Sequence, residues 1–318
     1  MQAAYVTVPL IIDTDPGVDD AVALMLALAA PEAELRAVTT VFGNVGLAST
    51  TPNAGRILAL CGRSDVPLAA GAARPLVHPQ RGRAEKVHGG DGLGGRAGAL
   101  PEPAAEPDPR GAVELMAAVL RESPEPVVIA PIGPLTNIAL LLAVHPELTD
   151  RIARIVWMGG ALGAGNISGV AEFNAYCDPE AAHRVLTQAD VPVTMVPLDV
   201  TMRCPAGPAW LDELAAAGPR CAELAQVITH YRAAYRSRYG IDAVAVHDAV
   251  AVLEAMLPGT LTTKPMRIEM ACDLGPARGA TVAVATGSGP AVDVAVEADA
   301  DTVLDAILDR LRRLDQAG

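Results

Sequence analysis

Cationic residues are scarce in this sequence of 318 residues. Lysine and arginine together number 24, against 37 aspartates and glutamates, so the formal net charge is −13. Nucleic-acid backbones and anionic membranes both need a basic surface on the protein that binds them. The charge balance therefore argues against nucleic acid or a membrane as a partner, and it favours a cation or a neutral small molecule.

Cysteines and long apolar runs are also scarce. The five cysteines form no C-x-x-C pair, so we expect neither a disulfide framework nor a cysteine metal site, and we predict a reducing, cytoplasmic setting. The longest apolar run, AVALMLALAA at residues 21–30, is too short for a membrane span. Because the opening MQAAYVTVPL has no basic region before its apolar part, we expect no signal peptide.

Hydrophobic residues make up 51% of the chain, which is enough for a full core. Neither an internal repeat nor an interdomain linker is visible, and we expect one domain over residues 1–318. Val/Ile-rich runs alternate with Ala/Leu-rich segments of helical period, which predicts an α/β fold with an open, mostly parallel, Rossmann-like sheet flanked by helices. The expected strands are residues 5–12, 35–41, 66–70, 126–130, 153–158 and 191–198, with additional short C-terminal strands at 266–272, 281–286 and 291–296.

Helices are expected between and after these strands. They cover residues 19–30, 51–62, 111–122, 135–144, 178–188, 220–238, 247–256 and about 300–314. The segment 74–110, rich in glycine, proline and arginine, is too long for a plain connection. We predict that it is either functional or mobile.

Four carboxylates in eight residues follow the first expected strand, in the stretch DTDPGVDD at residues 13–20. Like charges this close repel one another, so the stretch implies a partner of opposite charge. Helix capping would explain Asp19 and Asp20 alone, and a turn would explain Asp15 alone. The four together favour a hard cation. Calcium suits clustered aspartates because it accepts several oxygens in irregular geometry, and magnesium is the alternative.

Polar residues also follow the other expected strands. Asn44 comes after the second strand, PIGPLTN after the fourth, and MGGALGAGNISGVAEFNAYCDP after the fifth. In open parallel sheets, ligands bind outside the carboxyl ends of the strands. We therefore expect these side chains to converge on one rim of the sheet.

The stretch IIDTDPGVDDAVAL resembles the N-terminal signature of the nucleoside hydrolase family, the inosine/uridine-preferring nucleoside N-ribohydrolases. The likeness continues in order through VFGN, VHGGDGLGG, GPLTNIAL, WMGGALGAGN, AEFNAYCDPEAA and HDAVAV, and it spans residues 11 to about 255. A D-x-D after a strand also suits haloacid-dehalogenase phosphatases. Those enzymes expect threonine where Gly17 stands, so the ordered matches favour the nucleoside hydrolases.

This resemblance implies a calcium-dependent enzyme that hydrolyses the N-glycosidic bond of ribonucleosides to ribose and free base. It implies Ca²⁺ ligands at Asp15, Asp20 and Asp248, and a fourth at the backbone carbonyl of Ile132, where family members commonly carry threonine. Asp15 would also be the general base. An anionic site would stabilise the positive charge that develops on the sugar during cleavage.

The resemblance implies further contacts to the sugar. They would come from Asp19, Asn44, Met158, Asn166, Glu172 and Asn174. Short amides and carboxylates suit hydroxyl groups because they donate and accept hydrogen bonds in fixed directions. For any single asparagine, loop stabilisation is the alternative, and for Met158 it is core packing.

Departure of the base requires a proton or strong hydrogen bonds, for which histidine is the usual donor. His247, adjacent to Asp248, is the leading candidate, and His88 in VHGGDG is the second. Tyr231 and Tyr235, with Tyr239, have the spacing of one helix face and match family positions that contact the base. A core stripe is the alternative for these tyrosines.

Two other functions stay open at this stage. One is a catalytically silent nucleoside- or ribose-binding protein of the same fold, and the other is a metal-dependent phosphatase. The resemblance implies a homodimer or homotetramer. It fits inosine/uridine or pyrimidine preference, and no residue in the sequence decides between them.

Overall fold

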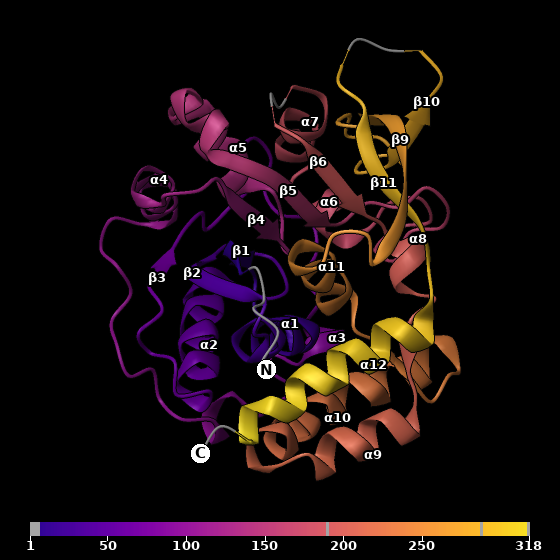
Figure 1. Ribbon diagram of the computed structural model, residues 1–318. Coiled ribbons are helices and arrows are strands. Elements are labelled where there is room, and N and C mark those ends of the chain that lie inside the picture. The colour runs from indigo at the N-terminus through magenta and orange to yellow at the C-terminus, as the bar shows by residue number, and fades with distance from the viewer. Residues whose placement is uncertain (1–6, 189–190, 287–288, 317–318) are drawn as a thin grey trace.

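One large sheet forms the centre of the molecule (Figure 1). The computed structural model describes residues 7–188, 191–286 and 289–316, and among these the strand order of the sheet is β10-β9-β11-β6-β5-β4-β1-β2-β3. The strands are β1 (Val8–Thr14), β2 (Ala33–Thr40), β3 (Leu68–Ala70), β4 (Val127–Pro131), β5 (Ile152–Met158), β6 (Val193–Val196), β9 (Leu261–Met270), β10 (Thr281–Val284) and β11 (Val292–Ala298). Strands β1 to β6 pair in parallel, whereas β9 pairs antiparallel with β10 and β11. The predicted α/β fold with additional C-terminal strands is confirmed.

Helices cover both faces of this sheet. They are α1 (Val18–Ala29), α2 (Leu47–Leu60), α3 (Glu85–His88), α4 (Ala112–Glu122), α5 (Thr136–Val144), α6 (Phe173–Cys177), α7 (Pro179–Gln188), α8 (Leu198–Thr201), α9 (Pro208–Ala216), α10 (Pro219–Tyr239), α11 (His247–Met256) and α12 (Ala300–Leu311). Within β1, Leu10 and Ile12 join the core formed with α1, α10 and α11, whereas Ile11 joins the core formed with α4, α5 and α7. This alternation is the period of a strand buried on both faces. None of the described helices combines the length and the apolar character that a bilayer crossing requires.

The topology places the functional rim. From β1 the chain moves outward through β2 to β3, and β4 then returns to pair with the other side of β1. Strands β1 and β4 therefore lead to connections that leave in opposite directions, which opens a crevice at their carboxyl ends. Asp15 follows β1 and Ile132 follows β4, so both lie at this crevice. The short strands β7 (Pro205–Ala206) and β8 (Val244–Ala245) form a separate ribbon just before α11.

Several element boundaries differ from the sequence prediction. Residues 5–6 of the first predicted strand lie outside the described residues. The helix predicted at 51–62 begins earlier, at Leu47. Pro52 lies inside this helix, although the residue before a proline usually avoids helical geometry. The predicted helix 300–314 ends at Leu311 and continues as a 3₁₀ turn, Arg312–Asp315. Segment 74–110 contains α3 and a 3₁₀ turn, Ala97–Ala99, and α3 packs against α10.

Candidate active site

Four carboxylates gather at the carboxyl end of β1. Asp15 directly follows β1, Asp19 and Asp20 lie in the first turn of α1, and Asp248 is the second residue of α11. Oxygens of Asp19, Asp20 and Asp248 lie within 4.8 Å of one another. All four residues are buried. The acidic cluster predicted after the first strand therefore also includes a residue of α11, Asp248, which lies 228 positions after Asp20 along the chain (248 − 20).

Hydrogen bonds hold two of these carboxylates in fixed positions. Asp20 accepts from the Thr14 hydroxyl at 2.5 Å and from the Gly17 N–H at 2.8 Å. Asp15 accepts at Oδ2 from the backbone N–H of Asn44, at 2.7 Å. A Cβ at Gly43 would lie 1.9 Å from Asp15 Oδ2, and one at Gly133 would lie 2.5 Å from Oδ1. Glycine is therefore required at both positions for the Asp15 carboxylate to fit.

Burial and mutual repulsion disfavour the charged forms of these carboxylates. Burial raises the pKa of Asp15, Asp19 and Asp248 well above the usual range, and repulsion between the carboxylates raises it further. Burial also raises the pKa of Asp20. Asp15 Oδ1 is buried and has no hydrogen-bond partner among the described residues. Buried carboxylates with a free oxygen are hard-cation ligands, so this arrangement can hold a metal ion.

Asp13, the first aspartate of DTDPGVDD, is hydrogen-bonded to other groups outside the cluster. Its Oδ1 accepts from the Thr39 hydroxyl at 2.6 Å and from the Asn137 side chain at 2.8 Å. Burial raises its pKa to about 7. Asp13 is therefore a structural residue that ties β1 to β2 and α5.

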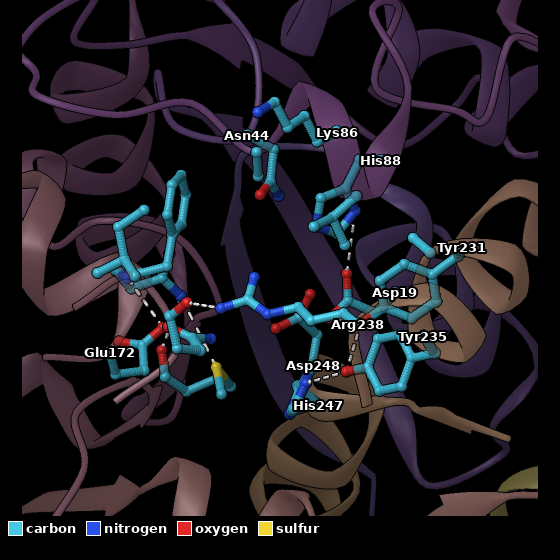
Figure 2. Close-up of a pocket in the computed structure, with 18 of the residues that line it drawn as sticks. Asp19, Asn44, Lys86, His88, Glu172, Tyr231, Tyr235, Arg238, His247 and Asp248 are labelled. Carbon is cyan, nitrogen blue, oxygen red and sulfur yellow. Dashed lines mark hydrogen bonds and ion pairs between the residues drawn. The ribbon is translucent and has the colours of Figure 1, made fainter. Parts of the chain in front are cut away.

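A cavity of about 980 Å³, counting the part open to solvent, lies above the cluster. Figure 2 shows its lining, with Asp19 and Asp248 between two walls. The predicted site residues that line it are Asp19, Asn44, His88, Ile132, Met158, Asn166, Glu172, Asn174, Tyr231, Tyr235, His247 and Asp248. Asp19 and Asp248 form the floor of the cavity. Asp15 and Asp20 do not line the cavity and are buried beside this floor.

One wall consists of the loop after β5 and the start of α6. The Asn174 side-chain amide donates to the carbonyls of Ile132, at 2.9 Å, and Met158, at 3.0 Å, so its own oxygen is left for a ligand. Asn166 Oδ1 is buried without a hydrogen-bond partner among the described residues. The wall therefore presents two amide oxygens, which can accept hydrogen bonds from hydroxyl groups.

Glu172 organises this wall as the N-cap of α6. Its carboxylate accepts from the backbone N–H groups of Asn174 at 2.8 Å, Gly160 at 2.9 Å and Ala175 at 3.0 Å. Burial raises the pKa of Glu172 to about 7 although these hydrogen bonds oppose the shift. The carboxylate is therefore already largely satisfied by the protein.

The opposite wall is aromatic and is built mainly by α10. The ring centroids of Tyr231 and Tyr235 lie 4.8 Å apart, and the ring of His88 lies 5.1 Å from that of Tyr231. Tyr231 and Tyr235 are buried, as a core stripe would be, and both also line the cavity. An aromatic wall with hydroxyl groups suits a flat, polar ring.

The two histidines are hydrogen-bonded and uncharged near neutral pH. His247 Nδ1 lies 2.6 Å from the Thr201 hydroxyl and Nε2 lies 2.7 Å from the Tyr235 hydroxyl. Burial lowers the pKa of His247 to about 4 and that of His88 to about 3. His88 Nδ1 accepts from the Val18 N–H at 3.1 Å. A neutral His247 ring carries a single N–H, and both of its nitrogens take part in a hydrogen-bonded chain with Thr201 and Tyr235.

Sequence reasoning missed Thr201, which contacts His247, and several residues that line the cavity. Thr201 belongs to the four-residue helix α8, which has no periodic pattern to reveal it. The unpredicted lining residues are Arg83, Ala84, Lys86, Val87, Ile167, Phe173, Ala234 and Arg238. Arg238 lies three residues after Tyr235, and that spacing on a helix was an available signal.

Known proteins resemble this chain over almost its whole length. The sequence model of the inosine-uridine preferring nucleoside hydrolase family matches residues 10–305. A pyrimidine-specific ribonucleoside hydrolase RihA of Klebsiella pneumoniae subsp. pneumoniae is 42% identical over 95% of this chain and 98% of that protein. The RihA of Escherichia coli O9:H4 is 40% identical over 96% of this chain and 98% of that protein.

Solved structures agree with this result. The plant nucleoside hydrolase PpNRh1 superposes with a TM-score of 0.89 at 31% identity, covering 95% of this chain and 98% of that chain. A purine-preferring ribonucleoside hydrolase from Gardnerella vaginalis superposes with a TM-score of 0.90 at 30% identity, covering 96% of this chain and 98% of that chain. The fold therefore accommodates purine and pyrimidine preference alike, and the relatives with the higher sequence identity carry the pyrimidine name.

Proposed function

Because this chain belongs to the inosine-uridine preferring nucleoside hydrolase family, we propose that it is a calcium-dependent hydrolase of pyrimidine ribonucleosides. It would release free base and ribose from uridine and cytidine. The observation that carries the proposal is the buried carboxylate cluster at the floor of a cavity lined by hydroxyl-binding amides on one side and aromatic rings on the other. The pyrimidine preference is supported by the names of the RihA relatives alone.

Asp15, Asp20, Asp248 and the Ile132 carbonyl are the proposed Ca²⁺ ligands. When bound, the ion would orient the sugar hydroxyls and make a water molecule more acidic. Asp15 Oδ1 has no hydrogen-bond partner among the described residues, so it is free to accept the proton of the attacking water. The negative charge of the cluster would stabilise the positive charge that develops on the ribose ring.

The other groups bind the sugar and the base. Asn166, Asn174 and Asn44 line the cavity with amide groups that can bind ribose hydroxyls. On the opposite side, the hydrogen-bonded chain of His247 and Tyr235 would donate to the departing base. Because both residues are buried, water does not compete strongly for these hydrogen bonds.

A nucleoside panel tests this proposal. We expect kcat/KM for uridine and cytidine to exceed the values for inosine, adenosine and guanosine, and we expect 2′-deoxyuridine to react far more slowly because it leaves a polar group of the site unpaired. A chelator should abolish turnover, and Ca²⁺ should restore it better than Mg²⁺. A purine preference, or turnover that a chelator leaves intact, would contradict the corresponding part of the proposal.

Asp15→Asn supplies a matched test of the cluster. The substitution removes a ligand charge and the proton acceptor together, so turnover should disappear and calcium binding should weaken. Asp178→Asn is the control, because Asp178 is an equally buried aspartate that accepts hydrogen bonds from Leu76 and Thr136 outside the cavity. Near-normal kcat in Asp15→Asn, or equal losses in the two variants, would sink the assigned role.

A further inference from the structure

Three exposed cationic side chains, Arg83, Lys86 and Arg238, line the cavity and are called the mouth cations below. Arg83 and Lys86 belong to the segment before and within α3, and Arg238 lies near the end of α10. The segment before α3 meets the loop that carries Asn166, because a Cβ at Gly82 would lie 3.3 Å from the Ile167 side chain. In a chain of net charge −13, positive charge is thus concentrated where a ligand must enter.

The protein leaves these charges largely uncompensated. On the same helix, Arg232 and Arg236 both bind Asp242. Arg238 differs: among the described residues it makes no ion pair, and instead its guanidinium donates to the carbonyl of Asn166 and lies 5.2 Å from the ring centre of Tyr239.

Like Arg238, Lys86 makes no ion pair within the described part of the chain. Arg83 approaches Glu85 at 3.4 Å, but both side chains are about half exposed, so water and salt screen that pair. The three mouth cations against one glutamate leave a net positive charge at the opening.

The two walls fix the direction in which a bound nucleoside points. With the ribose diol at the carboxylate floor and the base against the tyrosine wall, the C5′ substituent lies on the far side of the sugar from the base. Figure 2 shows Glu172 on that far side, opposite Tyr231 and Tyr235, and Arg238 extending from α10 across the space between the walls. The guanidinium of Arg238 reaches the carbonyl of Asn166 on that side.

We infer that the cavity binds ribonucleoside 5′-monophosphates as a further class of ligand, with the phosphate held by the mouth cations. This inference rests on the proposed function, which sets the orientation of the sugar. A guanidinium can bind two phosphate oxygens through its planar fork, and an ammonium adds a compact charge. Arg238 would exchange the carbonyl of Asn166, a neutral acceptor, for a charged one.

Among the described residues that line the cavity, Glu172 is the acidic side chain on that wall, and it does not prevent phosphate binding. Its carboxylate already accepts hydrogen bonds from the N–H groups of Gly160, Asn174 and Ala175, which spread its charge. Lys86 lies beside Asn44, away from Glu172, so the phosphate can contact Lys86 and Arg238 from the solvent side (Figure 2).

The test uses two probes that the enzyme cannot hydrolyse, pseudouridine and pseudouridine 5′-monophosphate. Their base is joined to ribose through carbon, so binding to the calcium-loaded protein can be measured by calorimetry without turnover. We expect the phosphorylated probe to bind at least as tightly as pseudouridine. Arg238→Met and Lys86→Met should each weaken its binding about tenfold or more, and should weaken pseudouridine binding much less.

Arg236→Met is the control, because Arg236 sits on the same helix outside the cavity; it should leave both affinities unchanged. Raising the salt concentration should selectively weaken the phosphorylated probe. Tenfold weaker binding of the phosphorylated probe to the unaltered protein would overturn the inference, as would equal losses of both probes in Arg238→Met. Turnover of uridine by the same preparation separates the two claims: turnover without phosphate binding sinks the inference alone, whereas no turnover and no pseudouridine binding sinks the proposed function.

Discussion

His247 shows how burial changes the chemistry expected of a single residue. Its lowered pKa of about 4 means that the ring is neutral at pH 7, so it is not the charged acid that an exposed histidine would become. Its Nε2 is engaged with the Tyr235 hydroxyl at 2.7 Å. A proton or hydrogen bond for the base would therefore come from the pair His247 and Tyr235 acting together.

This view predicts a shared loss. His247→Ala and Tyr235→Phe should each lower kcat for uridine by about 10²-fold or more, the range of a general acid. Both should spare p-nitrophenyl riboside, whose leaving group departs as a stable anion. Tyr239→Phe, which removes a hydroxyl from the exposed end of the same tyrosine stripe, should cost much less. Equal losses of both substrates in His247→Ala would instead mean that the substitution disturbs neighbouring Asp248.

Residues whose role could be derived from their chemistry belong to an unusual local sequence pattern. Asp15, Asp19 and Asp20 are predictable because four carboxylates in eight residues are costly without a cation. The roles of Ile132 and Asn174 came from resemblance to a family and not from their chemistry. Arg238 was missed because an arginine near a helix end is ordinary on a surface, and its position across the cavity depends on the loop carrying Asn166.

At the scale of elements, α10 matters because it supplies the aromatic wall and Arg238. The helix ends at Gly240, which has a φ of +69° and donates its N–H to the Arg236 carbonyl. A Cβ there would meet no atom within 4 Å, so the cost of a side chain is conformational and not a clash.

Gly240→Ala should therefore loosen the end of α10 at a cost of about 1 to 2 kcal/mol in local backbone strain. We expect KM for uridine to rise more than kcat falls, because the mouth is disturbed and the floor is not. Gly259→Ala is a close control: its φ is +88°, its Cβ would also meet nothing within 4 Å, and it lies in the turn after α11. A similar rise in KM in both variants would refute a specific role for the end of α10.

Periodic patterns were sufficient for most of the long elements, although α9 (Pro208–Ala216) was not predicted, and they were insufficient for the short ones. The prediction of a helix at 247–256 matches α11, because its apolar residues repeat at helical spacing and are buried. Helices α3, α6 and α8, of four to five residues, are too short to show a period. These short helices carry His88, Asn174 and Thr201, so the least predictable elements supply much of the site.

Across the whole molecule, buried ionisable groups couple stability to pH and to calcium. The carboxyl groups of Asp13 and Glu172 have pKa values of about 7, and burial raises those of Asp15, Asp19 and Asp248. The folded chain without a cation therefore binds more protons than the unfolded chain above about pH 4, and it loses stability as pH rises toward and beyond 7. His88 and His247 act in the opposite direction, because their lowered pKa values make the folded chain bind fewer protons between about pH 4 and 6.5. Well above that window both rings are neutral in the folded and the unfolded chain, so they no longer change the stability with pH.

Between pH 6.5 and 8, then, the raised carboxyl groups of the folded chain still lose protons, and Tm in a chelator should fall across this range. Calcium should reduce the fall, because a bound cation favours the charged carboxylates of the cluster and leaves those of Asp13 and Glu172 unaffected. At a Ca²⁺ concentration about a hundred times the Kd at pH 8, the gain at pH 8 should be about 2.7 kcal/mol, or roughly 5 °C in Tm. At the same Ca²⁺ concentration the gain should be smaller at pH 6, because protons compete with the cation for the carboxylates. Thermal unfolding with calcium and with a chelator at both pH values measures it. Asp248→Asn should lose most of the gain while Asp178→Asn keeps it, and a gain that is equal at pH 6 and pH 8 would show that the buried carboxylates are not the groups that bind the ion.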